Sequence, residues 1–313
     1  LRPTIRRIIP ISAAHVWPPA YTLEPEDSRT AFEAVAERLG SHVSALRDLP
    51  AEAILSAWRE FFAGIPAEHP VRSGRWFRGP VVDGRWMPDY DHRSPVPDVP
   101  TMAINTDTEG SFYTVETLPH PTDERELRGM VADYLLKGTD RVPDSLPEEL
   151  VEHYRAAARR RGGPTDPVSL YTEIYGDGVF RYQIVRLAER AARESTAPQY
   201  LMHFDYTVSP PAFGSPHEAT SPFLFGTHGT DLHRRSFGDG PLEQQVAAEF
   251  MDLVSSFAHG EPPHSAHCPR WPEFTPDRAS TLVLGGRGGP RVTEVPKYDQ
   301  LRVWDRAEWV PRP

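Results

Sequence analysis

Hydrophobic residues recur at helical spacing in several segments of the chain. One stripe ends at Gly260 and consists of Leu242, Val246, Phe250, Leu253 and Phe257. Residues three or four positions apart lie on one face of a helix, so this pattern predicts an amphipathic helix over residues 241–259 with its stripe buried. The same reasoning predicts helices over residues 30–39, 50–62, 123–137, 146–160 and 178–194.

Two of these helices have a capping signal at their first residue. Thr30 precedes Glu33 by three positions, and Ser145 precedes Glu148 by the same spacing. In a capping box, the hydroxyl and the carboxylate satisfy backbone N–H groups that have no partner inside the helix. The sequence therefore predicts helix starts at Thr30 and Ser145.

Short apolar runs between the helices predict strands over residues 99–104, 200–204, 281–284 and 301–304. Strands that alternate with helices are typical of an α/β protein with a layered sheet. In such proteins the loops at the carboxyl ends of the strands carry the chemistry. The helical block over residues 120–195 is a candidate for a lobe packed on that sheet.

Composition and charge exclude several classes of protein. The 313 residues are 39% hydrophobic, and no apolar run approaches the roughly 20 residues that span a bilayer. Lys and Arg number 34 against 44 Asp and Glu, which argues against nucleic acid or a membrane surface as a partner. Only two residues, Lys137 and Lys297, are lysines, which favours a GC-rich bacterial source but leaves the cytoplasm and the exterior open as locations.

The histidines and the single cysteine do not form a metal-binding pattern. His264 and His267 lie beside Cys268, but prolines make this segment irregular and no further ligand completes a tetrahedral set. His228 and His233 lie in a Gly-rich loop that we expect to be solvated. The run 285–289 (GGRGG) lacks the Lys-Ser/Thr ending of a phosphate loop, so it predicts a hairpin turn.

The most informative pair is Glu109 and His217. Glu109 follows the strand predicted over residues 99–104, and His217 follows the strand predicted over residues 200–204. If the two strands are parallel, both side chains lie on the same edge of the sheet. A carboxylate that orients an imidazole makes two thirds of a catalytic triad, in which histidine is the general base.

The chain also resembles a known family in six segments that occur in a fixed order. These are PVVDG (80–84), EG (109–110), YGD (175–177), YLMHF (200–204), GSPH (214–217) and SFAHGEP (256–262). Together they are similar to the type-B carboxylesterase and cholinesterase family of α/β-hydrolases, over nearly the whole chain. The resemblance implies a mixed, mostly parallel sheet flanked by helices and a carboxylic-ester hydrolase that needs no metal or organic cofactor.

Residue by residue, the resemblance makes Glu109 the triad acid and His217 the general base. It also makes Trp76 a candidate for lining the acyl site. The family's nucleophile lies in a Gly-x-Ser-x-Gly elbow upstream of the acid, and these 313 residues contain no such elbow. The opening segment RRIIPIS (6–12) resembles the strand that follows the elbow, with Ser12 behind the triad.

By this alignment, residues 1–313 are the C-terminal portion of the hydrolase domain. The expected partner is therefore the N-terminal part of the same hydrolase, which would carry the serine and the oxyanion loop, and the expected substrate is a small-molecule ester. We also expect an apolar edge or face of the sheet to be left open where the first strands belong.

Three positions depart from the family's pattern, namely Asn105, Thr108 and Thr220. They leave a catalytically inactive, hydrolase-like binding module as an alternative. An α/β enzyme with another nucleophile, of which Cys268 is the only thiol, is a weaker one. Hydrogen-bond distance between Glu109 and His217, about 2.6–3.2 Å, would favour the enzyme over the binding module.

Overall fold

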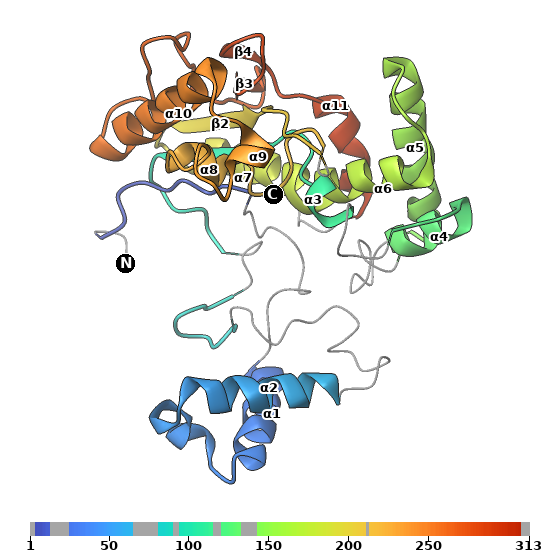
Figure 1. The fold of residues 1–313 in the computed structure, drawn as a ribbon, viewed down its shortest axis with the longest axis vertical. Coiled ribbons are helices and arrows are strands. Elements are labelled where there is room, and N and C mark those ends of the chain that lie inside the picture. Colours follow the sequence, from blue (N-terminus) through green and yellow to red (C-terminus); the bar gives the residue numbers. More distant parts are fainter. Residues whose placement is uncertain are drawn as a thin grey trace. The chain divides into compact units, whose positions relative to one another are not determined.

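The protein's structure is a computed structural model that describes residues 4–12, 25–64, 81–89, 94–114, 120–132, 143–210 and 213–307 (Figure 1). The chain forms two compact units. The sheet unit consists of Leu1–Val16, Pro95–Leu136 and Arg141–Glu308, and the helical unit consists of Trp17–Ser94, Lys137–Asp140 and Trp309–Pro313.

The sheet unit contains a mixed sheet in the order β1-β2-β3-β4. β1 (Thr101–Thr106), β2 (Gln199–Phe204) and β3 (Ser280–Leu284) are parallel, whereas β4 (Arg291–Glu294) pairs antiparallel with β3. The first three confirm predicted strands. The turn that joins β3 and β4 contains the GGRGG run, which confirms the predicted hairpin.

The segment over residues 8–12 extends this sheet beyond β1. Ile8 and Ile11 form parallel bridges with Thr101 and Ile104. Its last hydrogen bond is the 2.8 Å contact from the Ser12 N–H to the Ile104 carbonyl. Ser12 therefore lies at the carboxyl edge of the sheet, beside the end of β1.

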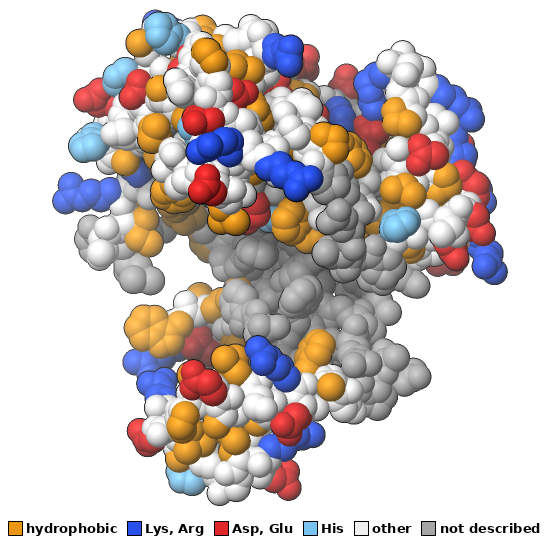
Figure 2. Space-filling model, in the orientation of Figure 1, with side chains coloured by type: hydrophobic (Ala, Val, Ile, Leu, Met, Phe, Trp, Pro, Cys, Tyr) orange, Lys and Arg blue, Asp and Glu red, His pale blue; other side chains and the backbone are white. Residues whose placement is uncertain are grey.

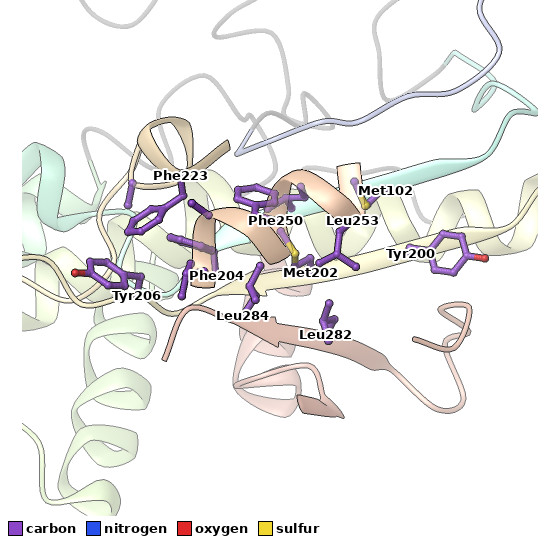
Figure 3. Packing of buried hydrophobic residues seen from close by; sticks show 14 of the residues in the cluster. Met102, Tyr200, Met202, Phe204, Tyr206, Phe223, Phe250, Leu253, Leu282 and Leu284 are labelled. Carbon is purple, nitrogen blue, oxygen red and sulfur yellow. The ribbon is translucent and has the colours of Figure 1, made fainter. Parts of the chain in front are cut away.

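Helices cover both faces of the sheet. On one face, α8 (Thr220–Leu224) and α10 (Pro241–His259) pack on alternate strand residues, and Figure 3 shows Phe250 and Leu253 of α10 beside Met202 and Phe204 of β2. On the other, α7 (Tyr182–Glu194) packs against β1 and β2. Burial on both faces explains why β1 and β2 are apolar without strict alternation.

The region 120–195 is helical where the structure describes it. It contains α4 (Glu124–Met130), α5 (Leu146–Arg161), α6 (Pro167–Gly176), the π-helical turn η3 (Asp177–Arg181) and α7. α6 was not predicted. It begins at Asp166, whose side chain accepts a hydrogen bond from the Ser169 N–H, and it continues through η3 into α7. The turn η3 directs residues of this helical run toward the carboxyl edge of the sheet.

Three details of the sequence prediction are wrong. α1 (Pro25–Arg38) begins five residues before Thr30, whose hydroxyl donates to the Glu26 carbonyl inside the helix. Ser145 precedes α5 but caps no backbone N–H, because its hydroxyl donates to the Glu149 side chain. The predicted strand over residues 301–304 is helical, in α11 (Tyr298–Leu301) and η4 (Arg302–Ala307), because Leu301 and Trp304 are three positions apart and both are buried.

The helical unit is described over α1, η1 (Val43–Asp48), α2 (Ala51–Ala63) and residues 81–89. Trp58 and Phe61 of α2 pack against Ala31 of α1. Figure 2 shows further hydrophobic side chains at the surface of this unit. Leu55 and Phe62 of α2 are half exposed. Among the described residues of the whole chain, no helix has both the length and the apolar character required to cross a membrane.

Candidate active site

Glu109 and His217 lie on loops that follow two neighbouring parallel strands. Glu109 lies in the turn between β1 and the short helix α3 (Ser111–Thr114), and His217 lies between β2 and α8. Since β1 and β2 are parallel and paired in register, both loops leave the same edge of the sheet. The prediction that the two residues share one edge is therefore confirmed.

The two side chains form a carboxylate–imidazole pair. His217 Nδ1 lies 2.8 Å from Glu109 Oε2. The other carboxylate oxygen, Oε1, accepts hydrogen bonds from the Ser12 hydroxyl at 2.6 Å and the Thr106 N–H at 2.8 Å. Glu109 is buried, and these three protein donors satisfy its charge. The carboxylate fixes Nδ1 as the protonated nitrogen, which leaves Nε2 as the atom that can accept a proton.

Backbone contacts fix the position of the two loops relative to each other. The Thr108 N–H donates to the Ser215 carbonyl at 2.9 Å, and the His217 N–H donates to the Glu109 carbonyl at 3.3 Å. Gly110 follows the acid because a Cβ at this position would lie 2.0 Å from the Thr172 carbonyl oxygen in α6. Steric contact therefore explains why glycine follows Glu109: this position touches the backbone of a neighbouring helix, which leaves no room for a side chain.

Aromatic rings surround His217. The ring centroid of Phe180 in η3 lies 4.5 Å from that of His217, and Tyr113 and Phe112 of α3 lie at 5.6 and 5.9 Å. Phe180 and Tyr113 stack on each other, whereas Phe112 is half exposed. These rings restrict the orientation of the imidazole and give one side of the site an apolar surface.

A second set of charged groups lies directly behind the acid loop. The guanidinium of Arg181 in η3 is 1% exposed and lies 3.0 Å from Asp177 Oδ1 and 3.6 Å from Asp107 Oδ1. It also donates to the carbonyl of Asp107. Arg181 thus holds the backbone at the end of β1, from which the turn to Glu109 begins.

His203 of β2 completes this set. The amide nitrogen of Asn105 lies 3.1 Å from His203 Nδ1, and Asp107 Oδ1 lies 3.1 Å from Nε2. An amide N–H can only donate, so Nδ1 is the acceptor and Nε2–H donates to Asp107. Burial lowers the pKa of His203, with the nearby Arg181 charge acting in the same direction. The pKa of Asp107 is also low: burial opposes ionisation, but the His203 hydrogen bond and the Arg181 charge outweigh it.

The three departures from the family's pattern have structural roles. Asn105 supports His203, as described above. The Thr108 side chain fills the space beside Gly214, whose φ is +64° and where a Cβ would lie 2.1 Å from the Thr108 hydroxyl. Thr220 is buried at the start of α8. None of these substitutions removes the contact between Glu109 and His217.

The other residues singled out in the sequence lie apart from this pair. Trp76 falls outside the described residues, so its role at an acyl site stays a prediction. The expectation of a solvated His228 is wrong, because its ring is buried and stacks on Phe223 at 5.2 Å. Burial raises the pKa of Cys268 to about 11. In the part of the chain that the structure describes, no three His, Cys, Asp or Glu residues cluster as metal ligands.

Sequence reasoning missed Arg181, Asp107 and His203. A signal for two of them was present, since Asp107 directly follows β1 and His203 faces Asn105 in the parallel register. Arg181 carried no such signal, because the π-helical turn that aims it at the acid loop was not predicted.

The mostly parallel sheet, its two helical layers and the carboxylate–imidazole pair at the carboxyl edge define an α/β-hydrolase. A model of the carboxylesterase family matches residues 2–304. The chain belongs to the carboxylesterase (type-B) family, which confirms the resemblance and indicates hydrolase activity of the carboxylesterase type. A search of curated proteins found no match.

Proposed function

We propose that this chain supplies the acid and the general base of a serine carboxylesterase. The observation that carries the proposal is the 2.8 Å contact between His217 Nδ1 and the buried carboxylate of Glu109. A buried carboxylate with three protein donors is a fixed charge that orients the imidazole. This supports the enzyme over an inactive binding module, for which such a pair has no use.

The reaction follows from the protonation of the pair. His217 Nε2 accepts the proton of a serine hydroxyl as its oxygen attacks the carbonyl carbon of the ester. Glu109 stabilises the imidazolium, which then gives the proton to the departing alcohol. Water, deprotonated by the same nitrogen, attacks the acyl-serine, and the carboxylic acid leaves as the serine recovers its proton.

We further propose that the serine and the oxyanion donors come from a polypeptide segment outside these 313 residues. The chain contains no Gly-x-Ser-x-Gly elbow. Ser12 is not a substitute, because its hydroxyl is buried and donates to Glu109 and does not face Nε2 of His217. The segment over residues 8–12 offers the place for docking, as it lies beyond β1 and begins near half-exposed Ile5.

The half-exposed ring of Phe112 beside His217 supports an ester with an apolar group on one side of the carbonyl. By the resemblance, Trp76 is proposed to contact the acyl group. No metal or organic cofactor takes part in the proposed reaction.

Reconstitution with a chromogenic ester tests the proposal. The purified chain is expected to be inactive, and addition of an N-terminal polypeptide that carries the elbow is expected to produce hydrolysis. Glu109→Gln in the reconstituted protein is expected to lower kcat by about 10⁴-fold, because an amide can donate to Nδ1 and so favour the wrong tautomer. Activity of the chain alone that survives both Glu109→Gln and His217→Ala would refute the proposal.

A further inference from the structure

A second carboxylate lies on the other side of the His217 ring. Glu218 Oε1 is 3.5 Å from His217 Nε2, the nitrogen that the proposed function assigns to the serine proton. The other oxygen of Glu218 accepts a hydrogen bond from the Ser221 hydroxyl at 3.2 Å. The Glu218 side chain is thus held toward the ring by α8 while more than half of its surface stays in solvent.

The backbone at Glu218 adopts a conformation that favours glycine. Its φ is +70°. Four non-glycine residues among those described have a positive φ, and two of them, Ser12 and Glu218, contact the acid–base pair. Such conformations are strained and concentrate at functional sites. The strain at Glu218 coincides with the contact between its side chain and Nε2.

The Glu218 carboxylate lies where a serine hydroxyl must approach. When Nδ1–H donates to Glu109, Nε2 carries the lone pair that accepts the serine proton, and Glu218 Oε1 lies 3.5 Å from it. Nε2 and the carboxylate are both acceptors, so the Ser221 hydroxyl, and not His217, holds the carboxylate in this position. Among the described residues, three titratable groups contact the ring: Glu109 on the acid loop, Tyr113 on α3, and Glu218 just before α8. The neighbouring rings of Phe112 and Phe180 carry no charge.

We propose that Glu218 is a reversible cap on the general-base nitrogen of His217, held in place until a serine hydroxyl displaces it. A serine must lie within about 3.2 Å of Nε2 to give up its proton, and the Glu218 carboxylate lies on that nitrogen. Its exposed side chain can rotate into solvent without breaking a buried contact. The cap rests on the proposed function, since it acts on the nitrogen that function uses, and it acts as a positioning residue.

Chemical modification of histidine in the intact chain tests the cap without any nucleophile. Diethyl pyrocarbonate acylates only an unprotonated imidazole nitrogen, and peptide mass spectrometry separates the rates at each histidine. With exposed His267 as the internal standard, Glu218→Ala and Glu218→Gly are each expected to raise the rate at His217 about two- to fivefold, the range of an exposed charge contact.

A matched control exists in the same chain. Glu261 lies 3.6 Å from His264 in an exposed pair, so Glu261→Ala is expected to change the rate at His264 and leave His217 unchanged. Unchanged His217 rates in both Glu218 variants would overturn the cap. A higher modification rate at His217 in Glu218→Gly alone would also overturn the cap. That result would show that relaxation of the backbone, and not loss of the carboxylate, exposes the ring.

The reconstituted enzyme provides a second readout. Removal of the cap is expected to lower the concentration of N-terminal polypeptide that gives half-maximal activity, because the docking serine no longer has to displace a carboxylate. An unchanged half-maximal concentration would contradict competition between the serine and Glu218. Absence of any hydrolysis in the reconstituted wild-type protein would refute the proposed function. The modification rates at His217 test the cap independently, because they need no nucleophile.

Discussion

Replacement of Arg181 by Met is expected to destabilise the sheet unit more than any change to a surface charge. The Arg181 guanidinium is almost fully buried between Asp177, at 3.0 Å, and Asp107, at 3.6 Å. Removal of one member of a buried ion pair costs about 3–5 kcal/mol, because the remaining charge stays buried without its partner. Lys297 lies 3.5 Å from Asp177 and compensates in part, so we expect a loss near the lower end, about 3 kcal/mol.

Urea unfolding measures this loss. The Trp304 ring packs on Gly178 in η3, so the fluorescence of buried Trp304 is sensitive to the region that surrounds Arg181. Arg234→Met is the matched control, because Arg234 pairs with Asp231 at 3.7 Å on the surface, and it is expected to change the free energy of unfolding by less than about 0.5 kcal/mol.

A double substitution separates charge from packing. If the cost of Arg181→Met arises from the uncompensated carboxylate, then Asp177→Asn in the same chain should recover part of it. A loss below about 1 kcal/mol for Arg181→Met, or no recovery in the double variant, would refute the argument that Arg181 neutralises buried charge.

Three further predictions concern packing, pH and backbone contact. Phe250→Ala should cost about 3–5 kcal/mol in urea unfolding, whereas Ala at half-exposed Met251 should cost far less. The lowered pKa values of His203 and Asp107 mean that the folded state binds fewer protons than the unfolded state. Stability should therefore decrease as the pH falls, first below about 6.5 and again below about 3.8. The first decline should be smaller in His203→Gln but not absent, because burial also lowers the pKa of His153. Gly110→Ala should abolish esterase activity of the reconstituted protein and lower stability, while Gly129→Ala, which meets no atom within 4 Å, should do neither.

Helices and strands with a continuous pattern of buried hydrophobic residues could be predicted from the sequence. The stripe of α10 occupies the predicted residues 241–259, because one face of that helix packs on the sheet along its whole length. The segment over residues 301–304 was misread because four residues do not distinguish an apolar strand from one helical turn. Leu301 and Trp304 pack as a turn because the Trp304 indole donates to the Tyr154 hydroxyl inside α5.

The proximity of Glu109 and His217 could be predicted for a different reason. Glu109 and His217 each follow a strand, and parallel pairing alone brings them to one edge. Contacts that depend on side-chain direction could not be predicted in this way. Arg181 reaches the acid loop only because η3 changes the helical repeat, and Glu218 reaches Nε2 only because its φ is positive.

In the part of the chain that the structure describes, the contacts that fix Glu109 and His217 come from the sheet unit. Ser12, Thr106 and the loop with His217 surround the carboxylate, and Arg181 holds the backbone from which the acid turn starts. Preorganised polar groups contribute to catalysis because they need not reorient during the reaction. On the proposed function, a docking segment would therefore not have to build this half of the site. It would have to place one hydroxyl against Nε2 and outcompete the carboxylate of Glu218, whose contact is long and exposed enough to be given up.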